Sequence, residues 1–113
     1  MSAKIYQLIK GTAAGTPLVK AFYVSSPIPV SVFVGGLAGV EVIDIQFLSN
    51  ITNTNIRDPQ NALDADWTDY FSETVQQQLK IDNNMIGLYV PGQYRVVSSA
   101  TTSGEITVGW CTG

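Results

Sequence analysis

The last third of the chain alternates between short apolar runs and groups of turn-forming residues. Pro91-Gly92 separates the first run from the second, and residues 98–104, rich in Ser, Thr and Gly, separate the second from the third. In the third run every second residue is apolar: Ile106, Val108 and Trp110. A period of two is typical of a strand with one buried face and one wet face. The pattern predicts three antiparallel strands within residues 85–110, joined as a β-meander.

Short β-prone runs separated by turn residues also fill most of the remaining sequence. The runs at 3–10, 18–25 and 30–34 are divided by segments that carry Gly, Pro or Ser. About eight short strands without an internal repeat predict an all-β fold, an antiparallel β-sandwich or jelly-roll-like domain, over residues 1–113. Residues 1–25 form either its first two strands, the slightly favoured interpretation, or an N-terminal arm that pairs with a neighbour's sheet edge.

Two places depart from this regular pattern. Between Val42 and Ile43 the apolar positions change phase, which predicts a β-bulge or a sharp twist within the strand. After the polar, turn-rich residues 50–66, the segment 67–81 fits two structures. Its apolar residues form a stripe at helical spacing, but the surrounding β pattern favours a strand over a helix.

Charged residues make up only 13% of the chain and apolar residues 45%. The surface is therefore covered mainly by uncharged polar residues, which is common where proteins assemble, because a buried charge costs desolvation. The net charge is −3 and the six Lys and Arg residues are scattered, so no nucleic-acid partner is expected. The longest apolar run, 28–40, is interrupted by Pro and Gly, and the first residues are too weakly apolar for a secretory signal. We expect synthesis in the cytoplasm and no membrane partner.

The chain holds little that could carry out catalysis or bind a cofactor. It has no histidine and one cysteine, Cys111, which excludes His-dependent nucleophilic systems, a thiolate metal cage and an internal disulfide. Four aspartates are potential Ca²⁺ ligands: Asp58, Asp64, Asp66 and Asp69. They do not match the EF-hand loop, so turn-forming or capping roles are favoured. A glycosidase requires two carboxylates that face each other across a groove, and nothing in the sequence indicates such a pair. We predict a non-enzymatic protein without a metal or cofactor.

Aromatic residues make binding better supported than catalysis. Trp67 follows the polar segment and lies close in sequence to Tyr70, Asp66 and Asp69. Aromatic rings stack on sugars or anchor protein interfaces, and adjacent carboxylates accept hydrogen bonds. These four residues are the candidate contacts for a partner or a glycan. For Trp67, burial in the core is an equally supported interpretation.

Arg95 is a cation within an otherwise apolar run. It is expected to pair across strands with Glu41, Asp44 or Glu105, or to project into a subunit interface.

The order of strand ends and turns over about residues 30–110 resembles small accessory structural proteins of tailed bacteriophages. The pattern reads V-x-V-x-x-G-G, D-x-x-W-T-D, T-V-Q-x-Q-L, P-G-x-Y-R and T-S-G-x-I-T-V. The matching positions include Val32, Gly35, Gly36, Gln46, Asp64, Trp67, Thr68, Asp69, Pro91, Gly92, Tyr94, Arg95, Ser103, Gly104, Ile106 and Val108. The resemblance implies a β-sandwich that decorates a capsid or joins a tail or neck, often as a trimer. It carries no catalytic signature and no functional residues.

These observations lead to one hypothesis and one alternative. The chain is expected to be a virion structural protein, a capsid decoration (cement) or head–tail accessory protein, made in the host cytoplasm. Its partners would be itself, as a homotrimer or another closed oligomer, and a phage capsid or tail protein. The alternative is a carbohydrate-binding β-sandwich module that recognises cell-surface glycans, with Trp67 and Tyr70 as the stacking platform.

Overall fold

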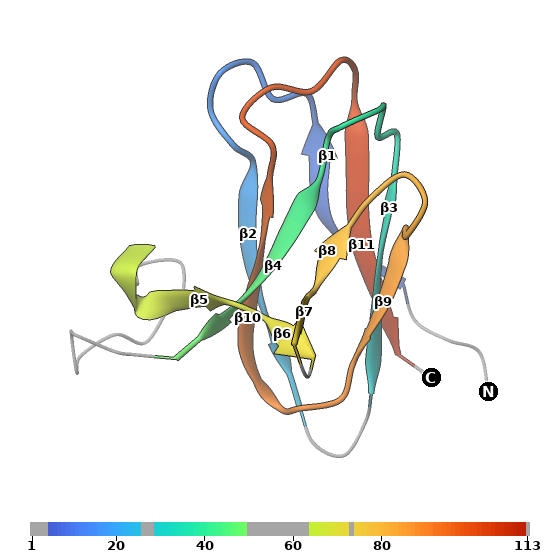
Figure 1. The fold of residues 1–113 in the computed structure, drawn as a ribbon. Helices are drawn as coiled ribbons and strands as arrows, with labels where there is room; N and C mark the ends of the chain where they lie inside the picture. Colours follow the sequence, from blue (N-terminus) through green and yellow to red (C-terminus); the bar gives the residue numbers. More distant parts are fainter. Residues whose placement is uncertain (1–4, 26–28, 50–63, 73, 113) are drawn as a thin grey trace.

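The computed structural model describes residues 5–25, 29–49, 64–72 and 74–112, which form two antiparallel sheets packed face to face (Figure 1). The first, here called the β1 sheet, has the order β1 (Ile5–Gly11), β11 (Ile106–Thr112), β3 (Val30–Gly35) and β9 (Met85–Leu88). The second, the β2 sheet, has the order β2 (Val19–Val24), β10 (Gly92–Ser98), β4 (Ile43–Leu48) and β5 (Trp67–Asp69). The all-β sandwich expected from the sequence is confirmed.

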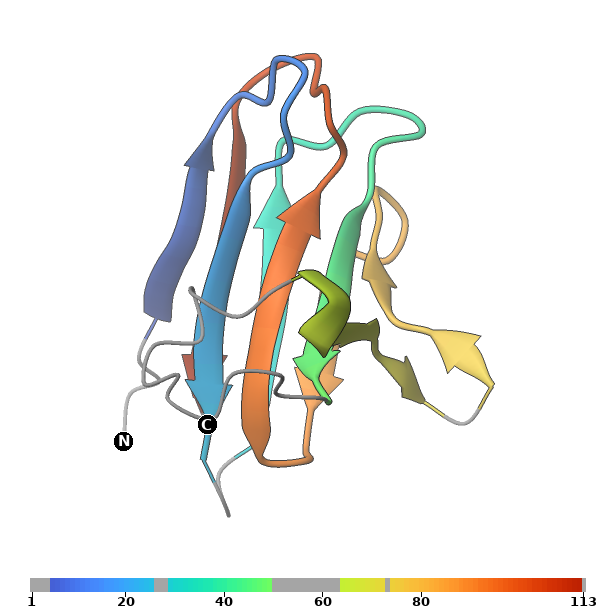
Figure 2. The same ribbon diagram turned by 90° about the vertical axis from the view of Figure 1, so that its left-hand side faces the viewer.

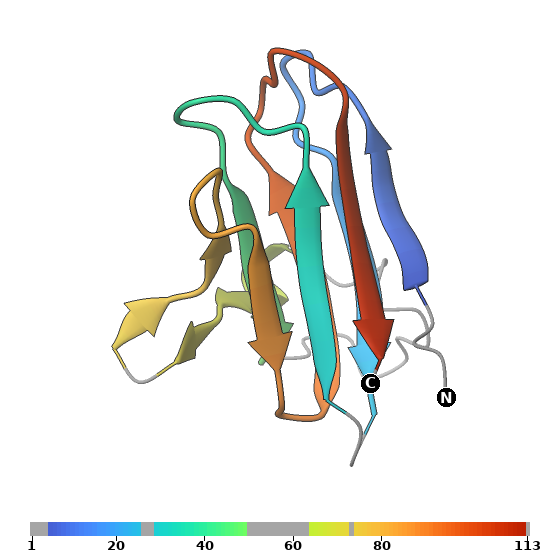
Figure 3. The same ribbon diagram turned by 90° about the vertical axis from the view of Figure 1, so that its right-hand side faces the viewer.

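The smaller elements lie between β4 and β9 in the chain. A 3-10 turn, η2 (Asp64–Asp66), precedes β5, and β8 (Gln78–Leu79) pairs with β4 beside β5. β6 (Phe71–Ser72) and β7 (Val75–Gln76) form a separate hairpin that projects from the sandwich (Figure 3). No helix in the described ranges has the length and apolar character needed to cross a bilayer.

The strand connections define a jelly roll. Four of the pairings are nested in the sequence: β1 pairs with β11, β2 with β10, β3 with β9 and β4 with β8. Such nesting is what results when one long antiparallel hairpin is rolled up, so that β1 to β4, and again β8 to β11, fall alternately in the two sheets. Residues 5–24 supply an edge strand to each sheet of this sandwich, β1 to one and β2 to the other.

The three C-terminal strands lie where the sequence predicts them, but they do not form a meander. β9 and β11 belong to the β1 sheet and β10 to the β2 sheet, so both connections cross between sheets. Pro-Gly and Ser/Thr/Gly segments specify a chain reversal, and a reversal serves a crossover as well as a hairpin. The turn residues therefore could not reveal which sheet receives the next strand.

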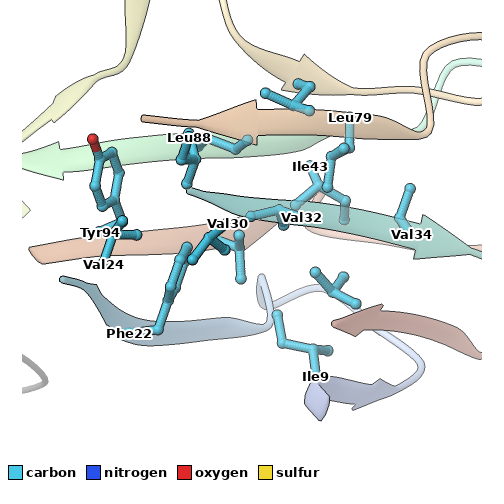
Figure 4. Packing of buried hydrophobic residues seen from close by; sticks show 14 of the residues in the cluster. Ile9, Phe22, Val24, Val30, Val32, Val34, Ile43, Leu79, Leu88 and Tyr94 are labelled. Atoms are coloured by element: carbon cyan, nitrogen blue, oxygen red, sulfur yellow. The ribbon is translucent and has the colours of Figure 1, made fainter. Parts of the chain in front are cut away.

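Alternate residues of the long strands fill one core between the sheets (Figure 4). In β10, Tyr94 and Val96 point inward, and in β3 the inward residues are Val30, Val32 and Val34. The Tyr94 hydroxyl donates a hydrogen bond to the Val90 carbonyl oxygen at 2.6 Å, which satisfies its polar group inside the core. Burial raises the pKa of Tyr94 to about 12, with a smaller contribution from the neighbouring Tyr70.

Segment 67–81 is made of strands, as the sequence analysis favoured, and contains no helix among its described residues. The predicted bulge near Val42 is wrong. β4 begins at Ile43, and the preceding residues belong to the β3–β4 loop, where Val40 is 96% exposed and Glu41 only 8% exposed. The phase change marks the start of the strand, because loop residues need not alternate.

Buried Glu41 holds two loops together at one end of the sandwich. Its carboxylate accepts hydrogen bonds from the Ala38 backbone N–H at 2.8 Å and from the Ser103 backbone N–H. The side chains of Ser99 and Thr102 make similar bonds, to the backbone of Val42 and of Ala13. These contacts join the β3–β4 and β1–β2 loops to the β10–β11 loop.

Candidate functional site

The candidate contact residues lie at the β5 edge of the β2 sheet. η2 carries Asp66, β5 carries Trp67 and Asp69, and Tyr70 follows directly. In Figure 2, η2 lies in front of β10 and β4, over the outer face of this sheet. The fold therefore separates these four neighbours in sequence into different environments.

Trp67 and Asp66 are buried in the isolated chain. Trp67 is 7% exposed and Asp66 is fully buried. The guanidinium carbon of Arg95 lies 4.9 Å from the Trp67 ring centroid, so a cation already covers this ring. A glycan would have to displace Arg95 to stack there. Contact between Trp67 and a partner stays a prediction that requires this rearrangement.

Tyr70 is directed toward the core. Its ring meets the Tyr94 ring edge-on, with the centroids 5.5 Å apart, and it packs against the buried cluster. Tyr70 and Trp67 therefore do not form one exposed platform of the kind that sugar stacking uses.

Arg95 is the centre of a hydrogen-bonded row on the outer face of the β2 sheet. Its Nε donates to Gln46 Oε1 at 2.6 Å, and Gln46 Nε2 donates to Asp69 Oδ1 at 3.0 Å. Its Nη1 forms an ion pair with Asp64 at 3.1 Å. The expected pairing with Glu41, Asp44 or Glu105 is wrong. The partner comes from η2, which the fold lays across the sheet.

The potential calcium ligands that the structure describes, Asp64, Asp66 and Asp69, are not gathered into one site. Asp58 lies outside the described residues, Asp64 pairs with Arg95 and Asp69 accepts from Gln46. Within the described ranges no three His, Cys, Asp or Glu side chains are grouped to hold a metal ion.

The outer face of the β1 sheet consists mainly of uncharged residues, in contrast to the charged outer face of the β2 sheet. The sequence did not reveal this face. Its outward residues form cross-strand rows that the pairing register defines. One row is Ile5, Cys111, Ser31 and Gly87, and the next is Gln7, Gly109, Phe33 and Met85. Together with Tyr89, these residues are here called the neutral face, since none carries a charge. Figure 3 views the sheet from this side.

Two aromatic rings lie against glycines of the neutral face. A Cβ atom at Gly109 would come within 2.8 Å of the Phe33 ring, and one at Gly87 within 2.9 Å of the Tyr89 hydroxyl. The glycines leave room for the rings to lie along the sheet, and the rings cover the backbone that the glycines expose. The result is an uncharged surface on which apolar side chains lie beside the polar residues Gln7 and Ser31. Met85 and Tyr89 on it are exposed.

The contrast between the two outer faces is one of charge. On the β2 sheet, Arg95, Asp44 and Asp69 face outward, each hydrogen-bonded to a glutamine. On the β1 sheet, Lys10 is the charged residue at the outward positions of the described strands, and it lies beyond the two neutral rows, opposite Thr107. The alternation in 106–110 signalled one outward face, but only the strand order brings the rows of four strands together.

A depression of about 340 Å³ lies at the loop end of the sandwich, lined in part by Val40, Glu41, Lys80 and Ile81. The Glu41 carboxylate there is already bound to two backbone N–H groups. The other charged residues that line the depression are Lys80 and Asp82.

Comparison of the chain with protein-family models, with curated proteins and with solved structures found no match.

Proposed function

We propose that this chain is a non-enzymatic structural protein that associates with copies of itself and with the capsid or tail of a bacteriophage particle. The observation that carries the proposal is the neutral face. An uncharged surface with exposed apolar side chains that crosses four strands is unusual for a chain that works alone, because exposed apolar patches mark contact sites. An interface built on it would bury no charge and so would avoid the desolvation cost.

The particle in the proposal comes from the resemblance of strand ends and turns, and the jelly roll supports it by analogy. Jelly rolls are common in viral capsids, but they also occur in lectins and cupins, so the fold alone does not choose among them. The carbohydrate-binding alternative is less well supported, because its stacking residues Trp67 and Tyr70 are not exposed together.

The first experiment is the solution mass of the purified chain, measured by light scattering behind a sizing column over a dilution series. We expect a closed oligomer, a fixed multiple of 12.2 kDa, at the higher concentrations. A mass of 12.2 kDa at every concentration would contradict self-association.

Partnership with a particle needs a separate experiment. Phage particles purified from a strain that encodes the chain should contain it at a constant ratio to the major capsid protein, as measured by quantitative mass spectrometry. A chain that stays in the particle-free fraction would contradict the virion location.

A further inference from the structure

We infer that the neutral face of one copy packs against the neutral face of a second copy across a two-fold axis. The inference rests on the proposed self-association and names the surface that carries it. It places Cys111, Met85 and Phe33 inside the contact and leaves the outer face of the β2 sheet free for other partners.

Charge favours this face over the other outer face. In a two-fold contact the same patch meets itself, so a charged residue near the axis meets its own copy. The outer face of the β2 sheet would bring together Asp44, Asp69 and Arg95 from both copies and would disrupt their hydrogen bonds to glutamines. The two rows of the neutral face bring together no charges. Lys10 lies beyond them, at the rim.

Shape also favours a second sheet as the occupant. Phe33 and Tyr89 lie along the sheet, and their rings cover the space above Gly109 and Gly87 that a protruding side chain would otherwise enter. Two sheets pack well when both faces are smooth, at a separation of about 10 Å. Two depressions are lined by residues from 34–42 and 80–84. They lie at the loop end of the sandwich and not on this face.

The size of the face is sufficient for a weak specific dimer. The whole outer face of the β1 sheet, which holds the neutral face, has four strands about 4.8 Å apart and up to seven residues of about 3.3 Å each, so it measures on the order of 400 Å² in projection. Side-chain relief increases the accessible area, so two copies bury on the order of 1,000 Å² in total, the lower limit for a specific interface. The dimer should therefore dissociate within an accessible dilution range.

The sheet edges are poorer candidates for the same contact. β1 has a register shift between Gln7 and Ile9, and β9 has only four residues. A bulge and a short strand both discourage the addition of another strand at an edge. Association is therefore expected through the face of the β1 sheet and not through its edges.

Cys111 is the only cysteine and lies in one of the rows, so its thiol reports on the contact. We would measure its rate of alkylation by iodoacetamide over the dilution series, with light scattering on the same samples. Because only the monomer exposes the thiol, labelling should slow about tenfold where about a tenth of the chain is monomeric.

Two variants and one control place the contact. Met85→Lys puts a charge in the second row and Ile5→Lys in the first, both at exposed positions where the fold tolerates lysine. Val75→Lys is the control, because Val75 is 63% exposed, like Met85 at 57%, but lies in the β6–β7 hairpin. Met85→Lys and Ile5→Lys should be monomeric with fully reactive Cys111, and Val75→Lys should behave as the unmodified chain.

The outcomes separate this inference from the proposed function. An oligomer that persists in both face variants, with Cys111 labelled at the same rate at every concentration, would overturn the neutral-face contact and leave self-association intact. A chain that is monomeric throughout would overturn both. If Met85→Lys loses its circular dichroism spectrum, Ile5→Lys and the protection of Cys111 in the unmodified chain decide the question.

Discussion

At the scale of single residues, Arg95 shows why a pairing rule read from sequence can choose the wrong partner. Cross-strand geometry suggested carboxylates on neighbouring strands, and the true partner, Asp64, lies in a turn folded over the sheet. Two further contacts of Arg95, with Gln46 and with the Trp67 ring, are less exposed than the ion pair. We therefore expect those two contacts to matter more for stability.

Substitutions at the two ends of the ion pair test this ranking. Asp64→Ala should lower the free energy of unfolding by less than about 0.5 kcal/mol, because its side chain is 95% exposed and such pairs are screened. Arg95→Ala should cost about 1–3 kcal/mol, since Gln46 loses a donor and Trp67 its cation. Urea unfolding followed by tryptophan fluorescence measures both. Equal losses would contradict the ranking.

The ionisation of Tyr94 should make the free energy of unfolding depend on pH in the alkaline range. The pKa of Tyr94 is about 12 in the folded chain against 10.0 for an unperturbed tyrosine, so the unfolded chain releases the proton first. Its contribution is complete below about pH 10 and declines as the pH rises from about 10 to about 12. Urea unfolding across this range should show the decline.

A phenylalanine at position 94 supplies the comparison. Tyr94→Phe keeps the ring contacts but loses the hydrogen bond to Val90, at a cost of about 1 kcal/mol near neutral pH. The alkaline decline should be smaller in this variant. An unchanged decline would show that other groups cause it. Tyr89→Phe, at an exposed ring, is the matched control and should leave stability at neutral pH unchanged.

At the scale of elements, the strands were predictable and their junctions were not. Alternation in 30–34 and 106–110 depends on which residues enter the core, so it is visible in the sequence. The role of Glu41 was hidden, because a charged residue between two valines resembles the wet side of a strand. In the structure the exposed residue is Val40 and the buried one is Glu41, which holds two loops.

Removal of the Glu41 carboxylate should loosen this end of the sandwich. Glu41→Ala leaves the Ala38 and Ser103 N–H groups without their acceptor, so we expect a loss of about 2 kcal/mol. Hydrogen exchange at these two amides should accelerate more than in the strands. Glu105→Ala, at an exposed position in the adjoining loop, is the control and should cost little. A similar small loss for both variants would contradict the role of Glu41.

At the scale of the whole molecule, the two outer faces predict how association responds to salt. A contact through the neutral face joins no charged pairs, so ionic screening should not weaken it. The mass from light scattering should stay constant between about 0.05 and about 1 M NaCl, or increase slightly, because an apolar contact is not screened. Dissociation at high salt would indicate a contact through charged residues, such as those around Arg95.

The sequence by itself determined the fold class and most strand positions. The period-two alternation and the Gly, Pro and Ser segments reflect local backbone geometry and the burial of one side of each strand. The favoured strand interpretation of 67–81 is confirmed for the same reason, because its surroundings are all β. The low share of charged residues, 13%, also suggested a surface that contacts other proteins.

Only the tertiary structure decided which strands are neighbours and what each outer face presents. The nested jelly-roll order places Ile5, Cys111, Ser31 and Gly87 in one row, although they come from four distant parts of the chain. It also buries Trp67 beneath Arg95 and turns Tyr70 toward the core. These arrangements depend on long-range strand pairing, and the turn residues that join the strands are compatible with more than one pairing.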